Sequence, residues 1–246
     1  MRSALSIAGF DSSDGAGLSA DLKTFSALGV RGSAVCVCLT AQTGGGVRAA
    51  EKTPTALIDA MFAAAVEAGA PDAAKTGMLF DEETVIAVCR NIRDYSLGNI
   101  VADPVMKSSS GSPLLTDGGV EALKKELLPL CDFVTPNTEE AGRFCGGAVE
   151  SEDDMETAAR AIGAFGARAV IITGGHLPGS EVCDLLFSGG RSHKIRRKRE
   201  GGSARGTGCV FSSALCAFLA RGLDEKEAVA RAGDFVSDMI RRERNS

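Results

Sequence analysis

The chain has 246 residues, 44% of them hydrophobic, which is enough to bury the core of one large α/β domain or two small ones. Its net charge of −5 at pH 7 disfavours a nucleic-acid-binding protein, which is usually basic. No apolar run approaches the ~20 residues of a membrane span, and the N-terminal segment turns polar too early for a secretory signal, so we expect a cytoplasmic protein without membrane or nucleic-acid partners.

Short apolar runs alternate with longer helical patterns along the first two thirds of the chain. The predicted strands are residues 5–9, 33–40, 73–78, 99–103, 133–135 and 169–173. The predicted helices are residues 16–28, 54–68, 81–95, 117–128, 139–145 and 153–165. Several strands lack polar alternation, as expected for strands covered on both faces. This order predicts an α/β fold with a mostly parallel sheet and helices on both sides.

The last third of the chain has a different pattern. Residues 183–187 and 191–195 predict a hairpin, and residues 208–220 and 224–241 predict two further helices. Earlier in the chain, Pro54 suits the first position of a helix that Thr53 would cap. No repeat and no low-complexity linker divides the sequence, so we predict one domain over residues 1–246.

The cysteines do not form a metal-binding pattern. The chain has eight cysteines and two histidines, with no Cys-x-x-Cys pair, which disfavours a zinc site. Most of the cysteines lie in apolar runs and are expected to be buried and reduced. Cys209 differs because its neighbours are threonine and glycine.

Polar loops follow the predicted strands, and ligands of open parallel sheets bind at the carboxyl ends of strands. Asp103 ends the fourth strand and is well placed for magnesium. Gln42 can donate and accept hydrogen bonds to a ring edge, and Met78 either packs on a flat ring or belongs to the core. Asn137 and Glu140 either face a metal and an anion or form a helix cap.

The glycine-rich turn at residues 205–209 precedes an apolar helical run. Its glycines allow backbone geometry that side chains forbid, and the helix start would present backbone N–H groups to a phosphate. Cys209 falls in the first helical turn, where the helix dipole favours a thiolate. Taken alone, the segment could equally be an ordinary glycine-rich loop.

Taken together, these motifs closely resemble the hydroxymethylpyrimidine/phosphomethylpyrimidine kinases of thiamine biosynthesis, a branch of the ribokinase-like superfamily. The resemblance covers essentially the whole chain and rests on motifs in family order at residues 7–17, 20–29, 40–43, 75–78, 103–106, 135–137, 174–177 and 206–209. It implies a three-layer fold with a mostly parallel sheet, ATP and Mg²⁺ as cofactors, and a homodimer.

The resemblance also implies roles for individual residues. The pyrimidine pocket would be lined by Gly9, Asp21, Gln42, Met78 and Val105. The metal would be held by Asp103 and Glu140, and the nucleotide contacted by Asn137, Thr173 and Gly175. The anion hole would consist of Gly206, Thr207, Gly208 and Cys209. In this branch a cysteine occupies the position of the catalytic aspartate of related sugar kinases.

Three positions depart from the family pattern. Thr173 stands where relatives usually carry a lysine that reaches the transferred phosphate. The lysine after the Asp-Pro-Val-Met segment is displaced, leaving Lys107, and Arg205 precedes the Gly-Thr-Gly turn. We expect Arg205 to supply part of the missing charge, with Lys107 as the second candidate and a solvated loop cation as the alternative.

The predicted reaction is transfer of the ATP γ-phosphoryl group to 4-amino-5-hydroxymethyl-2-methylpyrimidine and then to its monophosphate. Cys209 would accept the hydroxyl proton or orient the hydroxyl. A pyridoxal-type kinase and a non-catalytic pyrimidine or nucleotide binder are the alternatives. The basic run at residues 194–199 is interpreted as a solvated edge or a flap near ATP rather than a nucleic-acid site.

Overall fold

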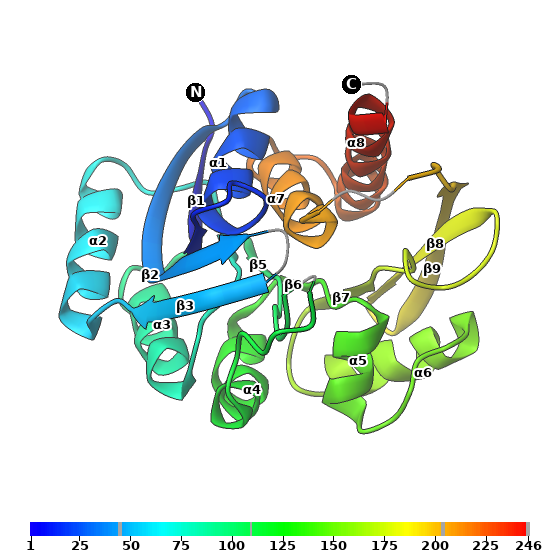
Figure 1. The fold of residues 1–246 in the computed structure, drawn as a ribbon, viewed down its shortest axis with the longest axis horizontal. Helices are drawn as coiled ribbons and strands as arrows, with labels where there is room; N and C mark the ends of the chain where they lie inside the picture. Colours follow the sequence, from blue (N-terminus) through cyan, green and yellow to red (C-terminus); the bar gives the residue numbers. More distant parts are fainter. Residues whose placement is uncertain (44–45, 109, 203–204, 245–246) are drawn as a thin grey trace.

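Six parallel strands form the centre of the sheet. In the computed structural model, which describes residues 1–43, 46–108, 110–202 and 205–244, the described strands form one sheet in the order β3-β2-β1-β4-β5-β6-β7-β8-β9 (Figure 1). The parallel strands are β2 (Arg31–Thr43), β1 (Ser3–Asp11), β4 (Ala73–Thr76), β5 (Ile100–Ala102), β6 (Phe133–Val134) and β7 (Ala169–Ile172). Antiparallel strands flank them: β3 (Gly46–Lys52), β8 (Glu181–Ser188) and β9 (Arg191–Lys198).

Helices cover both faces of this sheet, giving three layers (Figure 1). One face carries α1 (Gly17–Ala27), α7 (Thr207–Ala220) and α8 (Glu225–Arg244). The other carries α2 (Thr55–Glu67), α3 (Glu82–Asp94), α4 (Asp117–Ala122), α5 (Thr138–Cys145) and α6 (Glu152–Gly163). The predicted three-layer α/β architecture is therefore confirmed for the described residues.

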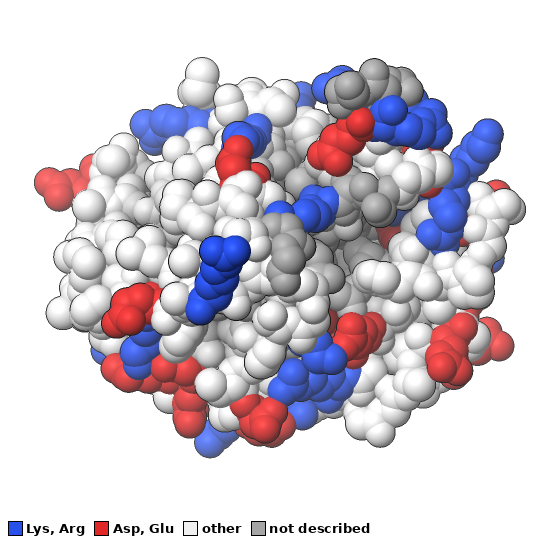
Figure 2. All heavy atoms as spheres, in the orientation of Figure 1, with Lys and Arg blue, Asp and Glu red and all other residues white. Residues whose placement is uncertain are grey.

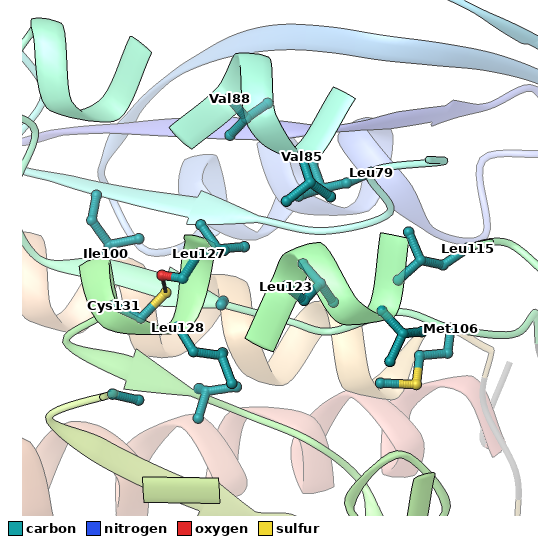
Figure 3. Packing of buried hydrophobic residues seen from close by; sticks show 14 of the residues in the cluster. Leu79, Val85, Val88, Ile100, Met106, Leu115, Leu123, Leu127, Leu128 and Cys131 are labelled. Atoms are coloured by element: carbon teal, nitrogen blue, oxygen red, sulfur yellow. Dashed lines mark hydrogen bonds between the residues drawn. The ribbon is translucent and has the colours of Figure 1, made fainter. Parts of the chain in front are cut away.

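Successive residues of the central strands enter different cores. Ala73 and Ile171 pack with α1, α7 and α8, whereas their neighbours Ala74 and Val170 pack with the helices of the opposite face. Figure 3 shows part of this second core, where leucines after α4 meet side chains of α3. Because successive side chains of a strand point to opposite faces, a strand covered on both sides is mostly apolar.

Several boundaries differ from the sequence prediction. Strand β3 was not predicted, and β9 extends to Lys198 instead of ending at residue 195. The helix predicted over residues 117–128 is α-helical only to Ala122 and continues as a π-helical turn (Leu123–Leu127). Thr53 does not cap α2, because Pro54 is itself the N-cap residue and no side chain bonds there.

The sheet places strands from both halves of the chain side by side. Among the described residues, none of the helices is both long enough and apolar enough to cross a membrane. The face in Figure 2 carries Lys and Arg side chains in separate small groups, with acidic side chains among them.

The basic run of β9 is engaged in ion pairs within the protein. Glu152, at the first position of α6, accepts Lys194 Nζ at 2.8 Å and Arg196 Nη1 at 2.7 Å. These two cations lower the pKa of Glu152 to about 2. The ion pairs fasten the edge hairpin to the helix layer.

We predict that Glu152→Gln lowers the free energy of unfolding by about 1 kcal/mol or less at pH 7. The pKa of Glu152 is lower in the folded than in the unfolded protein, so its ion pairs stabilise the folded state at any pH above the ordinary glutamate pKa. This stabilisation is lost as the pH falls toward 2 and the carboxylate becomes protonated. Urea unfolding from pH 7 to pH 2 should therefore show the difference from wild type shrinking. Asp153→Asn, beside it in the same helical turn, is the control, and a difference independent of pH would contradict the prediction.

Candidate active site

The carboxyl ends of the parallel strands meet at one edge of the sheet. Strand β1 ends at Asp11, two residues after Gly9, β4 ends two residues before Met78, and β5 ends directly before Asp103. Asn137 follows β6 and forms a parallel bridge with Thr173, which follows β7. The sheet thus brings segments separated by up to 164 positions (173 minus 9) to one edge, as the sequence predicted.

The turn before α7 has the predicted form. Gly206 is the N-cap of α7 with φ of 70°, and a Cβ there would lie 2.3 Å from the carbonyl oxygen of Gly15. A side chain is therefore excluded both by backbone conformation and by contact with the first loop. No side-chain cap occupies the helix start, and a Cβ added at Gly208 would meet only open space. The start of α7 can accept an anion on its backbone N–H groups.

Arg205 joins this turn to the loop after β1. Its guanidinium lies 3.9 Å from the Asp11 carboxylate, contacts Ser13 Oγ at 3.4 Å, and packs over Gly15. Burial would raise the pKa of Asp11, but hydrogen bonds from Ser13 and Gln42 and the charge of Arg205 lower it overall. With 40% of its side chain exposed, Arg205 remains accessible beside the start of α7.

A fully buried lysine lies beneath the edge. Lys75 of β4 is 2.6 Å from Asp21 of α1 and 3.8 Å from Asp103, with the lysine and Asp21 completely inaccessible to solvent. Burial alone would lower the pKa of Lys75, but the carboxylates of Asp21 and Asp103 outweigh it and raise that pKa. The ammonium therefore stays charged.

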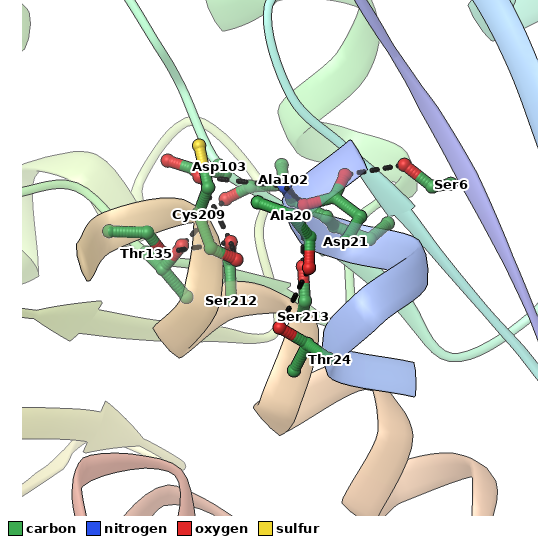
Figure 4. A network of polar contacts seen from close by, with 12 residues as sticks. Ser6, Ala20, Asp21, Thr24, Ala102, Asp103, Thr135, Cys209, Ser212 and Ser213 are labelled. Atoms are coloured by element: carbon green, nitrogen blue, oxygen red, sulfur yellow. Dashed lines mark hydrogen bonds and ion pairs between the residues drawn. The ribbon is translucent and has the colours of Figure 1, made fainter. Parts of the chain in front are cut away.

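Two serines of α7 complete this polar network (Figure 4). Ser213 Oγ donates to Asp21 at 2.6 Å, and Ser212 Oγ donates to Asp103 at 2.9 Å. Figure 4 also shows Ser6 of β1 donating to Asp21. The buried charges consequently fix α1, β1, β4 and α7 relative to one another.

Cys209 lies above the network in the first turn of α7, beside Asp103 (Figure 4). Burial raises the pKa of its thiol to about 12, the nearby Asp103 and Asp21 add to the effect, and Lys75 opposes it. This direction is opposite to the thiolate expected from the helix start, because burial has the largest effect on the pKa of the thiol and two carboxylates add to it. Cys209 is a neutral thiol at physiological pH.

Of the five residues predicted to line the pyrimidine pocket, four lie at or near the ends of strands and the fifth, Asp21, lies in the buried network. Gly9 and Met78 are in contact, since a Cβ at Gly9 would lie 3.2 Å from Met78 Sδ and 2.6 Å from Cys38 Sγ. Gln42 and Val105 are half-buried at the ends of β2 and β5. Asp21 differs, because it is completely buried with its oxygens taken by Lys75, Ser6 and Ser213. Asp21 supports the edge from below and presents no surface to a ligand.

Asn137 and Glu140 form the helix cap that the sequence left open. The Asn137 side chain accepts the Glu140 N–H and the Glu140 side chain accepts the Asn137 N–H, both at 2.9 Å. Burial and the neighbouring Asp103 raise the pKa of Glu140 to about 8. A capped helix start does not exclude a ligand role, because two mutually repelling carboxyl groups favour a cation between them.

The remaining predicted residues lie farther along the same edge. Thr173 is half-buried, and Gly175 is exposed in the loop between β7 and β8. Lys107 is 45% exposed and ion-paired with Glu139. Residues 44–45 of the predicted loop after β2 lie outside the described part of the chain.

Sequence reasoning assigned no role to Lys75 or to its neighbour Thr76. The Thr76 hydroxyl is buried and has no hydrogen-bond partner among the described residues. A lysine inside the apolar strand predicted over residues 73–78 was the available signal, since a lysine is almost never fully buried unless it is paired.

Comparisons with known proteins agree with this geometry. A sequence model described as phosphomethylpyrimidine kinase matches residues 11–246. A hydroxymethylpyrimidine/phosphomethylpyrimidine kinase of Aquifex aeolicus is 38% identical, over 97% of this chain and 94% of the relative. A thiamine biosynthesis bifunctional protein of Geobacter sulfurreducens is 40% identical over 97% of this chain, which spans only 49% of that protein.

Solved structures show the same fold. The phosphomethylpyrimidine kinase of Clostridium difficile superposes with a TM-score of 0.86 at 37% identity, covering 98% of this chain and 100% of the other. The pyridoxal kinase of Staphylococcus aureus in complex with AMP-PCP and pyridoxal gives 0.88 at 35% identity, covering 96% and 87%. The chain is thus a phosphotransferase with the ribokinase-like fold. It belongs to the phosphomethylpyrimidine kinase family.

We predict that Lys75→Met lowers the free energy of unfolding by about 3–5 kcal/mol, because it leaves two carboxylates buried without a cation. Adding Asp21→Asn should recover part of this loss by removing one of the uncompensated charges. Urea unfolding of wild type, single variant and double variant at pH 7 measures both effects. If adding Asp21→Asn to Lys75→Met lowers the free energy of unfolding further instead of recovering part of the loss, the prediction is contradicted.

Proposed function

We propose that the protein transfers the γ-phosphoryl group of ATP to 4-amino-5-hydroxymethyl-2-methylpyrimidine and then to the resulting monophosphate. The observation that carries this proposal is the start of α7, where N–H groups without a side-chain cap lie close to Asp103, which accepts a hydrogen bond from Ser212 of the same helix. The relatives named for this reaction match nearly the whole chain. Phosphoryl transfer depends mainly on positioning and charge stabilisation, which such an edge supplies.

In this proposal the ring of the pyrimidine lies against Gly9 and Met78, with Gln42 and Val105 at its edge. Asp21 acts from beneath by fixing Lys75. The N–H groups of Gly206, Thr207, Gly208 and Cys209 face the transferred phosphoryl group. Such donors act most strongly when they are held in place before the charge develops, and the contact of Gly206 with Gly15 holds this turn.

The nucleotide would lie along Asn137, Thr173 and Gly175. AMP-PCP, an ATP analogue, is bound by the S. aureus relative, which supports ATP as the phosphoryl donor. Gly175 has open space where a Cβ would lie, so a phosphate can approach its backbone.

Asp103 and Glu140 would hold the magnesium ion. Both are at most 9% exposed, and the charge of Asp103 helps to raise the pKa of Glu140, a repulsion that a divalent cation relieves. No group of three or more His, Cys, Asp or Glu side chains in the described ranges could hold a metal alone. Magnesium is usually bound by one or two carboxylates together with substrate phosphates, so this pair fits. Bound magnesium would neutralise charge on the ATP phosphates.

The test of the proposal is a mass-resolved ATP assay. The pyrimidine alcohol should give its monophosphate, and the monophosphate should give the diphosphate. Pyridoxal is the parallel substrate, because kinases named for it share the fold at 34% identity or more. Phosphorylation of pyridoxal alone would replace the proposed substrate, and tight binding without any product would indicate a non-catalytic binder.

We predict that Cys209→Ala lowers kcat for the first phosphorylation about tenfold more than kcat for the second. A neutral thiol orients the acceptor hydroxyl, whereas the acceptor phosphate of the second step is already ionised and needs less assistance. Cys209→Ser should retain more first-step activity than Cys209→Ala, because a hydroxyl can still orient the acceptor. Equal losses in the two steps would rule out this role.

We predict that Arg205→Met lowers kcat/KM for ATP by about a hundredfold or more. The guanidinium is an accessible positive charge beside the start of α7, where it would stabilise the charge of the transferred phosphoryl group. Lys107→Met is the matched control and should stay within about threefold of wild type. Steady-state kinetics with ATP varied checks both variants. If Lys107→Met abolishes turnover and Arg205→Met does not, the charge belongs to Lys107.

A further inference from the structure

Arg199, one residue beyond the end of β9, is bonded to the backbone of the loop that joins β7 to β8. Its guanidinium donates to the carbonyl oxygens of Gly175 at 2.7 Å, Leu177 at 2.5 Å, Gly179 at 2.8 Å and Glu181 at 3.4 Å. Within the described part of the chain this arginine forms no ion pair with a carboxylate. Its donors are therefore used to gather one loop around a single charge.

A second contact fixes the beginning of the same loop. The N–H of Gly174 donates to Asp184 Oδ1 at 3.0 Å, and the other oxygen of this fully buried carboxylate lies 2.6 Å from Arg197 Nη1. A Cβ at Gly174 would lie 2.0 Å from the carbonyl oxygen of Cys183, so the loop leaves β7 flat against β8. The loop is thus attached to the hairpin at both ends.

These contacts determine which way the loop presents its donors. In a planar trans peptide the C=O and the following N–H point in opposite directions. Because the carbonyls of Gly175 and Gly179 point to Arg199, the N–H groups of His176 and Ser180 point away from it. Without the guanidinium, four carbonyl oxygens would converge with no positive charge among them, and the loop would have to open.

We propose that Arg199 is a positioning residue for nucleotide binding. It shapes residues 174–181, so that Gly175 and the following N–H are held ready for the nucleotide phosphates. This inference rests on the proposed function, which places the nucleotide at Gly175. Arg199 acts through the loop and does not touch the nucleotide, because four of its five N–H donors are bonded to carbonyl oxygens of the loop.

The experiment compares Arg199→Met with Arg191→Met, which makes the same chemical change at an exposed site at the other end of β9. The affinity for ADP with Mg²⁺ is measured by calorimetry, and amide hydrogen exchange of residues 174–181 by mass spectrometry. We expect Arg199→Met to weaken ADP binding about tenfold or more and to accelerate exchange in this loop, with β7 and α7 unchanged. Arg191→Met should leave affinity within about twofold of wild type and exchange unchanged.

The variant Arg199→Lys distinguishes positioning of the loop from direct contact between Arg199 and the nucleotide. It also replaces Arg199→Met in the experiment if that variant does not fold. A single ammonium cannot reach all four carbonyls, so affinity should fall and loop exchange should rise, each by less than in Arg199→Met. Wild-type affinity in the lysine variant, or weak binding without faster exchange, would overturn the proposal. So would faster exchange with unchanged affinity.

The same measurements distinguish this inference from the proposed function. If wild type binds ADP but phosphorylates no pyrimidine, the proposed substrate fails and the comparison of affinities still decides the role of Arg199. If wild type does not bind ADP at all, both proposals are overturned.

Discussion

The buried ammonium of Lys75 is the interaction on which the rest of the edge depends. It lies between Asp21 of α1 and Asp103 after β5, and α7 adds Ser212 and Ser213 to the same carboxylates. Charges this deeply buried are tolerated only when each is paired and hydrogen-bonded. The arrangement therefore permits little relative movement of α1 and α7. Because the turn at residues 205–209 leads directly into α7, the same network also fixes the position of that turn.

The same network sets the electrostatic character of the site above it. Burial is the main reason why the pKa of the Cys209 thiol is raised, and the carboxylates of Asp103 and Asp21 add to the effect against the charge of Lys75, so the thiol stays protonated. The positive side chains at the rim, Arg205 and Lys107, are each paired with an acidic residue. An incoming phosphate must therefore compete for these cations, whereas the backbone donors at the start of α7 have no side chain to displace.

The sequence predicted the parts of the fold that depend on apolar periodicity and on glycine. Strands β4, β5, β6 and β7 are buried at every residue and appear as mostly apolar runs, and Gly206 has the left-handed conformation expected of its turn. Strand β3 was not predicted, because it is an exposed edge strand whose sequence mixes polar and apolar residues as a loop does. Its pairing with β2 is the contact that places it in the sheet.

The polar interior was less accessible to sequence reasoning. Asp21 and Lys75 are 54 positions apart, and nothing in the local sequence of either reveals that the two form a buried pair. The neutral thiol of Cys209 depends on carboxylates from other elements, so its local position in a helix turn gave the wrong charge state. The partners of Arg199 are backbone carbonyls, which leave no residue pattern to find.

The contact between Gly206 and the carbonyl of Gly15 has a consequence for how the molecule is made. It joins positions 15 and 206, so the loop that contains Gly15 cannot make this contact until the turn at Gly206 has been synthesised about 190 residues later. At ribosomal speeds of roughly 5–20 residues per second, that interval is on the order of ten to forty seconds. During it the sheet can assemble strand by strand, but the anion turn does not yet exist. Catalytic competence is thus acquired only after the turn at residues 205–209 has been synthesised, and a nascent chain can hold much of the fold before it can bind the phosphate it would transfer.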